Sequence, residues 1–99
     1  MTVHNQTSWA YLLRKMLDEK DDSLVKLCIY LDNIPTFVPI DHYKFCAKFD
    51  DDYGGVEGCS FTAWGEKNVY FPCCYDGEEW IECVPRNPEL SVSPHFGGG

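Results

Sequence analysis

One amphipathic segment near the start of the chain constrains the fold most strongly. In residues 7–19, TSWAYLLRKMLDE, the large apolar side chains fall at the spacing of a single helical stripe: Trp9, Leu12, Leu13, Met16 and Leu17. Thr7 or Ser8 supplies the N-cap of this predicted helix. A helix with one apolar stripe has to bury that stripe against another element, so the rest of the chain must provide a complementary surface.

The rest of the chain predicts mainly strands. Residues 23–32 are rich in branched and aromatic side chains, and residues 36–40 predict a short second strand that Pro39 restricts to a sheet edge. Three later segments predict a meander of antiparallel strands: residues 60–64, 68–75 and 80–85. The sequence therefore predicts an α+β fold, with the N-terminal helix packed on a small antiparallel sheet of about 4–5 strands.

The connecting segments carry more specific predictions. Residues 18–23, DEKDDS, have the composition of a solvated acidic turn, and residues 33–35 predict the turn between the first two strands. Residues 41–49 suit a helix or a strand, and we assign them to a short second helix that Asp41 caps.

The last hairpin has its own turn signal. Residues 76–79, DGEE, contain the Asp-Gly pair that is typical of β-hairpin turns. If all four residues form the loop, Tyr75 pairs with Trp80, and this aromatic contact helps to set the register.

The length of the chain allows one domain. A second hydrophobic core would not fit into 99 residues. We expect residues 1–88 to form the α+β domain, and residues 89–99, which end in three glycines, to form an irregular, flexible tail.

The charge of the chain narrows the classes of partner. With 8 basic and 16 acidic residues the net charge is −8, which repels nucleic acid and attracts basic protein surfaces. The apolar runs are far shorter than the ~20 residues that a membrane helix needs, and no signal-peptide pattern is visible. We therefore expect a cytoplasmic protein that binds neither nucleic acid nor membrane.

The cysteines allow more than one interpretation. They are Cys28, Cys46, Cys59, Cys73, Cys74 and Cys83. In a reducing compartment, those in apolar strand segments act as small buried hydrophobes. His42 and Cys46 lie one turn apart on the predicted second helix and, with one or two of Cys59, Cys73, Cys74 and Cys83, could hold a structural zinc ion. The acidic residues near Cys59 disfavour the thiolate that catalysis would need.

No catalytic signature is present in the sequence: we find no Walker loop, nucleophile elbow or zinc-protease helix. We therefore expect a protein without enzymatic activity or cofactor that acts by binding. The residues that we expect at the interface are five carboxylates with one of two aromatic anchors: Asp50, Asp51, Asp52, Glu78 and Glu79, with Trp64 or Trp80. Tyr70 is a further anchor if it is exposed.

A resemblance points in the same direction. Residues 61–88, FTAWGEKNVYFPCCYDGEEWIECVPRNP, resemble a segment of small uncharacterised proteins of bacteriophages and prophages. Short acidic proteins of this type often inhibit host defence, as anti-CRISPR proteins do. The resemblance implies an inhibitor that occludes a basic surface or groove of a host protein, with nucleic-acid mimicry as one means. The alternative is the structural zinc domain, with His42, Cys46 and Cys59 among its ligands.

Overall fold

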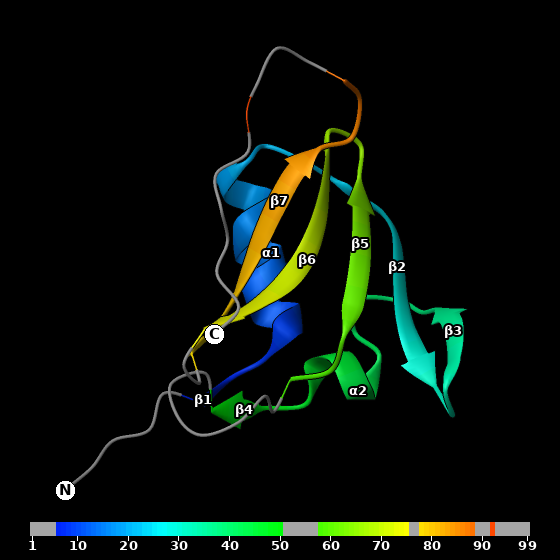
Figure 1. The fold of residues 1–99 in the computed structure, drawn as a ribbon. Coiled ribbons are helices and arrows are strands. Elements are labelled where there is room, and N and C mark those ends of the chain that lie inside the picture. Colours follow the sequence, from blue (N-terminus) through cyan, green and yellow to red (C-terminus); the bar gives the residue numbers. More distant parts are fainter. Residues whose placement is uncertain (1–5, 51–57, 76–77, 89–91, 93–99) are drawn as a thin grey trace, which may run out of the picture.

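The computed structural model describes residues 6–50, 58–75, 78–88 and 92. It contains a five-stranded antiparallel sheet with the strand order β3-β2-β5-β6-β7 (Figure 1). The strands are β2 (Leu24–Leu31), β3 (Ile34–Phe37), β5 (Phe61–Gly65), β6 (Asn68–Tyr75) and β7 (Glu78–Pro85). The helix α1 (Trp9–Glu19) packs on one face of this sheet. The predicted α+β fold is confirmed.

Three short elements lie at one end of the sheet. The strands β1 (Gln6–Thr7) and β4 (Phe49–Asp50) form a separate two-stranded antiparallel sheet, and α2 (Tyr43–Cys46) is a helix of one turn. The predicted second helix is therefore present, but it is shorter than expected. Its cap is His42 and not Asp41, because the His42 Nδ1 atom accepts a 3.2 Å hydrogen bond from the backbone N–H of Lys44.

The core lies between α1, α2 and one face of the sheet. Its largest fully buried side chains are Trp9, Leu13, Leu27, Phe45 and Tyr70. The helical stripe is confirmed as a core face, and Ser8 is its N-cap, with its hydroxyl accepting a 3.1 Å hydrogen bond from Tyr11 N–H. Tyr70 has an exposed fraction of 0%, so it does not meet the condition under which it could serve as an anchor.

The acidic turn after α1 is not only a solvated loop, because Asp22 in this turn forms hydrogen bonds to distant parts of the chain. The Asp22 carboxylate accepts hydrogen bonds from the Tyr70 hydroxyl at 2.7 Å and from the backbone N–H groups of Lys67 at 3.0 Å and Asn68 at 3.1 Å. It also accepts one from Ser23 N–H at 2.8 Å. Asp22 therefore ties the end of α1 to the turn between β5 and β6.

The same contacts determine how the two side chains titrate. Burial raises the pKa of Asp22, but the hydrogen bonds from Tyr70, Lys67, Ser23 and Asn68 outweigh this and leave the pKa below its ordinary value. Burial, and next the hydrogen bond to Asp22, raise the pKa of Tyr70. At neutral pH the pair is thus a carboxylate that accepts from a protonated phenol.

Asp21 ends α1 in a left-handed conformation. Its φ is 50°, and the backbone N–H groups of Asp21 and Asp22 donate to the carbonyl oxygens of Asp18 at 3.2 Å and Leu17 at 2.9 Å. This double hydrogen bond is the Schellman motif, in which glycine is the preferred residue at the left-handed position.

Replacing Asp21 with glycine is expected to raise the free energy of unfolding by about 0.5–1 kcal/mol, because the strain at positive φ is removed. The 3.6 Å ion pair of Asp21 with Lys67 is exposed and contributes little. Urea denaturation measures the change. The control is Asp18→Gly within the helix, which should lower stability by about 1 kcal/mol. A loss of stability in Asp21→Gly would contradict the assignment.

Both predicted hairpin turns need correction. The first turn consists of Asp32 and Asn33, with φ of 51° and 64°, and β3 already begins at Ile34, opposite Leu31. Two residues at positive φ make the tight turn that matches the twist of the strands, and Asp and Asn tolerate that conformation. The predicted second strand does lie at one edge of the sheet, but it spans Ile34–Phe37 and not residues 36–40, so Pro39, from which the edge position was predicted, lies outside it.

In the second hairpin the register differs from the expected one. Tyr75 pairs with Glu78, and Trp80 pairs with Cys73, so two residues and not four separate the paired strands. Two-residue connections are the commonest in hairpins, and Asp-Gly is among their preferred sequences. Except for Val92, the expected tail, residues 89–99, lies outside the described residues.

Candidate protein-binding surface

The face of the sheet that points away from α1 is the most unusual surface of the protein. Side chains alternate between the two faces of a strand, so the neighbours of buried Leu27, Ala63 and Ile81 point outward. We call this side of the sheet the open face. Its residues are Lys26, Cys28, Tyr30, Pro35, Phe37, Thr62, Trp64, Val69, Phe71, Cys73, Tyr75, Glu78, Trp80, Glu82 and Val84.

The open face is apolar where a polar surface is expected. An antiparallel sheet with one solvated face normally alternates between apolar and polar side chains. In this sheet the side chains that point inward and those that point outward are both mostly apolar. The charged residues of the open face are Lys26, Glu78 and Glu82. Both helices are on the other side, where Trp9 and Phe45 contact Phe61 at centroid distances of 5.3 and 5.0 Å. A contiguous apolar surface of this kind is typical of a binding site.

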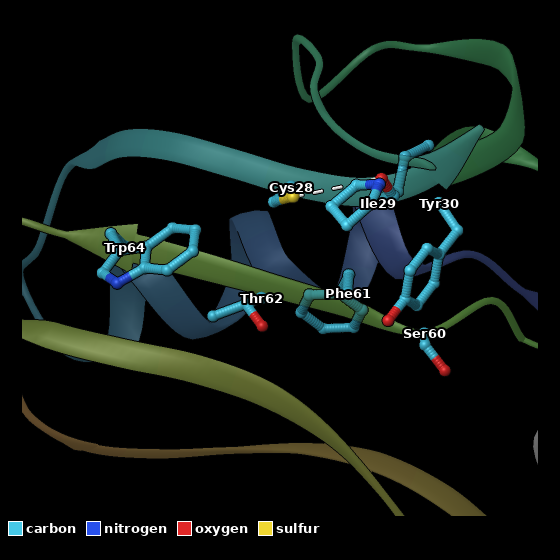
Figure 2. Close-up of a pocket in the computed structure, with 8 residues that line it drawn as sticks. Cys28, Ile29, Tyr30, Ser60, Phe61, Thr62 and Trp64 are labelled. Carbon is cyan, nitrogen blue, oxygen red and sulfur yellow. Dashed lines mark hydrogen bonds between the residues drawn. The ribbon is translucent and has the colours of Figure 1, made fainter. Parts of the chain in front are cut away.

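A hollow of about 380 Å³ lies on the open face over β2, β3 and β5. Figure 2 shows Trp64 and Tyr30 at opposite ends of the hollow, with Thr62 between them. The short side chains of Cys28 and Thr62, which are cross-strand partners, leave the space that the two aromatic rings border. The hollow is therefore shaped to receive a side chain of a partner.

Aromatic rings on this face already hold a cation. The Lys26 ammonium lies 5.1 Å from the centroid of the Phe37 ring, and Phe37 packs edge-on against Trp64 at 6.2 Å. Attraction of a cation to an aromatic face has an electrostatic origin, and it strengthens when water is excluded. The open face can accordingly accommodate basic side chains as well as apolar ones.

Trp80 lies on the part of the open face that β6 and β7 form, away from the hollow. Its indole Nε1–H donates a 3.1 Å hydrogen bond to Glu82 Oε2, which fixes its polar end and leaves the apolar ring half-buried.

The strands β5 and β6 pair over a short stretch, in which Ala63 pairs with Tyr70 and Trp64 with Val69. Figure 1 shows β6 and β7 curving away from β5 together, so the face is curved and not flat.

The predicted interface residues are distributed unequally. Trp64, Trp80 and Glu78 all lie on the open face, and Glu78 is exposed. Glu79 points to the other side, is 4% exposed and accepts a 3.3 Å hydrogen bond from Gly58 N–H. It belongs to the interior of the domain, so we remove it from the candidate surface.

The acidic loop is only partly described. Asp50 lies in β4, where its backbone pairs with that of Gln6. Asp51 and Asp52 lie outside the described residues. The structure therefore brings the two tryptophans and Glu78 onto one surface, and it leaves the contribution of residues 50–52 as a prediction.

Several residues of the open face were absent from the sequence-based set, notably Tyr30, Phe37 and Phe71. For Phe71 the signal was present in residues 68–75, NVYFPCCY, in which both alternating sets of side chains are mostly apolar. A strand buried on one face only should alternate with polar residues. Two apolar sets of side chains in one strand therefore indicate that the sheet has a second apolar face.

The alternative zinc site finds no support within the described segments. The His42 Nδ1 atom caps α2, and its ring stacks on Tyr43 at 4.7 Å. Cys46 donates to the Ile40 carbonyl at 3.6 Å, and Cys59 to the Lys44 carbonyl at 4.0 Å. Among the residues that the structure describes, no three His, Cys, Asp or Glu side chains gather in a way that could hold a metal ion.

The environment of Cys59, which precedes β5, and of Cys73 in β6 favours the protonated thiol. An opening of about 190 Å³ between this segment and β6 is lined by Cys59, Cys73, Cys74 and Glu79, among others. Burial raises the pKa of Cys59 against the lowering effect of Lys44, and burial raises the pKa of Cys73 as well. Metal binding and nucleophilic attack both need the thiolate, so this environment favours neither.

Comparison with known proteins gives no further assignment: no protein-family model, no curated protein and no solved structure matches the chain. Within the described residues, no helix combines the length and the apolar character that crossing a membrane requires.

Proposed function

We propose that this protein acts by binding and occluding a basic surface of a partner protein, with the open face as its contact surface. The observation that supports this most is the apolar outward set of side chains on the sheet, with Tyr30 and Phe37 exposed by 58% and 61%. Aromatic residues of this kind supply most of the binding energy in protein interfaces.

The charge of the chain supports a basic partner. A net charge of −8 attracts a positively charged surface over a distance of about 10 Å at ordinary ionic strength. The open face itself is mainly apolar, so charge steers the encounter and apolar burial holds the complex. Direct occlusion therefore fits this surface better than nucleic-acid mimicry alone.

The resemblance of residues 61–88 to bacteriophage proteins suggests the setting of this activity. In that setting the partner is a bacterial host protein with a basic surface, such as a component of a defence system. The protein would inhibit it stoichiometrically, without turnover, in the host cytoplasm.

The test starts with capture of a partner from bacterial lysate and continues with the purified pair. Replacing Trp64 with alanine should lower the affinity about 30-fold or more, because it removes an aromatic border of the hollow. Phe37→Ala is the second variant, since Phe37 is exposed and its loss should leave the fold intact. Interferometry measures the affinities, and the activity of the partner should fall to a minimum at a 1:1 ratio.

The matched control is Tyr11→Ala. Tyr11 is an aromatic residue on α1 with an exposed fraction of 60%, close to that of Phe37, but it lies outside the open face. Its replacement should leave the affinity unchanged. If Trp64→Ala and Phe37→Ala both bind as tightly as the original protein while remaining folded, the open face is not the interface.

A further inference from the structure

A second opening, of about 240 Å³, lies where α2 and β4 are found, and it shares no residue with the hollow of the open face. Figure 1 shows α2 and β4 at the same end of the molecule as the start of α1. The start of α1, α2, β4 and the residues before β5 all contribute to its walls. We call this opening the α2 pocket, and its lining includes Trp9, Tyr43, Lys44, Lys48, Phe49 and Gly58.

The charged residues of the α2 pocket are basic. Lys44 lies in α2, Lys48 follows that helix, and both line the pocket. Within the described segments no Asp or Glu lines it, although the chain has 16 acidic residues and 8 basic ones. Neither ammonium group forms an ion pair or a hydrogen bond with another described residue. The pocket therefore carries two available positive charges on an otherwise acidic chain.

The indole of Trp9 supplies a third donor beside the pocket. Trp9 is 1% exposed, and its Nε1 atom is buried without a hydrogen-bond partner among the residues that the structure describes. A buried donor of this kind is unfavourable, because the N–H has lost its contact with water and has gained no acceptor in exchange. An acceptor that a ligand brings into the pocket would satisfy it.

Gly58 controls the access of such an acceptor to the indole. A Cβ atom at position 58 would lie 2.6 Å from Cε2 of the ring and closer still to Nε1, so only glycine lets the backbone approach the ring this closely. The hydrogen bond that Gly58 N–H donates to Glu79 Oε1 is long, at 3.3 Å. A small movement of the Gly58 backbone would therefore open Nε1–H to the pocket, since no side chain at this position has to be displaced.

Aromatic rings form the apolar part of the walls. Phe49 is 6% exposed and packs against Trp9 at a centroid distance of 4.7 Å. Tyr43 is exposed, and its ring stacks on that of His42 at 4.7 Å. Apolar walls with a few converging polar groups are typical of small-molecule sites. The volume suits a ligand of about the size of one ring with one charged group.

We propose that the α2 pocket binds a small molecule that carries a phosphate or carboxylate group on an aromatic or aliphatic body. The anionic group lies between the ammonium groups of Lys44 and Lys48 and accepts a hydrogen bond from Trp9 Nε1–H. The body of the ligand packs on Tyr43 and Phe49. This inference is independent of the proposed function, because it concerns another site and a ligand of the opposite charge.

The same features select against other occupants. Two ammonium groups repel a cation. A nucleic-acid strand would bring many phosphates into the field of a chain whose net charge is −8. A small molecule brings a single anionic group, and short hydrogen bonds from charged donors can hold it against that field.

The first test is a titration with phenyl phosphate and with benzoate at constant ionic strength. In ¹⁵N NMR spectra either ligand should move the indole N–H signal of Trp9 in a saturable way, and the indole signals of Trp64 and Trp80 should stay in place. The ligand that binds more tightly identifies the anionic group. Inorganic phosphate should bind more weakly than phenyl phosphate, because it has no body to pack on the rings. If neither ligand moves the Trp9 signal, or if the Trp64 signal moves in its place, the proposal is wrong.

Removal of the two lysine charges tests the anion contact. Lys44→Gln with Lys48→Gln should weaken binding of the preferred ligand about tenfold or more. The matched control is Lys15→Gln with Lys20→Gln, which removes two exposed lysines of the α1 segment and changes the net charge equally. An equal loss in both double variants would attribute the effect to the net charge and would contradict a site at α2.

The contact with the indole has a readout of its own. Binding should move the backbone amide signal of Gly58 together with the indole signal of Trp9, and it should slow the hydrogen exchange of that indole N–H. In a folded Trp9→Phe variant, which keeps an aromatic ring but lacks the donor, the affinity should fall about fivefold or more. Unchanged affinity in this variant would show that Nε1–H is not part of the site.

These outcomes are separate from those of the proposed function. Trp64→Ala should leave the affinity for phenyl phosphate and benzoate unchanged, because Trp64 lies on the open face. If neither ligand binds while Trp64→Ala weakens the captured partner, the open face is an interface and the α2 pocket is not a site. If the Trp9 signal moves while the Trp64 and Phe37 variants keep full affinity for the partner, the pocket is a site and the hollow is not.

Discussion

Replacement of Asp22 with alanine is expected to lower the free energy of unfolding by about 3 kcal/mol. The carboxylate accepts hydrogen bonds from the Tyr70 hydroxyl and from the backbone N–H groups of Lys67, Asn68 and Ser23. Alanine leaves these donors without their charged acceptor, and Tyr70 has an exposed fraction of 0%. An unsatisfied buried donor costs about 1–3 kcal/mol, and several donors are affected here. Urea denaturation at neutral pH measures the loss.

Two further variants separate charge from shape. Asp22→Asn keeps the shape of the side chain but not its charge, and should lower stability by about 1–2 kcal/mol. Tyr70→Phe removes one donor, and its effect should be much smaller in the Asp22→Ala background than in the original protein. Additive effects of the two changes would contradict the direct contact between Asp22 and Tyr70.

The pH dependence of stability provides an independent check of the same contact. The pKa of Asp22 in the folded protein lies below its ordinary value of about 3.9. The stability that the carboxylate contributes is therefore present above about pH 4 and is lost as the pH falls from there through the folded pKa. The difference in stability between the original protein and Asp22→Asn should shrink over this range. A difference that stays constant down to pH 2 would show that Asp22 is not stabilised as a carboxylate.

Replacement of Gly58 with alanine is the second change with a large expected effect. A Cβ atom at this position would lie 2.6 Å from Cε2 of the Trp9 indole and closer still to its Nε1 atom. Trp9 is 1% exposed and packs against Phe49 at 4.7 Å and Phe61 at 5.3 Å, so the ring has little room to move. Overpacking of this kind should lower the free energy of unfolding by about 2–3 kcal/mol.

A smaller ring at position 9 should relieve this strain. In the Trp9→Phe background the cost of Gly58→Ala should fall by about 1 kcal/mol or more, because the six-membered ring leaves space for the new methyl group. Ser60→Ala, an exposed change two residues away, is the control and should be nearly neutral. Denaturation of the four combinations at positions 9 and 58 measures the coupling, and equal costs in both backgrounds would contradict the close approach.

The hairpin between β6 and β7 shows how a register can be wrong while the faces are right. A four-residue loop would have paired Tyr75 with Trp80, but Tyr75 pairs with Glu78. The two registers differ by two residues, and a shift of two keeps every side chain on the same face of the sheet. Trp80 is therefore on the face that the predicted pairing implied, beside Cys73 in place of Tyr75.

The sequence by itself determined the elements whose signal is local. The stripe of α1 and the strand segments follow from the spacing of apolar residues, because this pattern depends on neighbours within a few residues. The α+β fold follows in turn, since one amphipathic helix needs a sheet to cover.

Only the tertiary structure decided which acidic and aromatic side chains reach the surface. Glu78 and Glu79 are adjacent and chemically alike, yet one is exposed and the other is 4% exposed next to Gly58. Asp22 looked like part of a solvated turn, and its partners Lys67, Asn68 and Tyr70 lie more than forty residues away. Such contacts form when distant segments pack, and composition cannot reveal them because it does not record which segments meet.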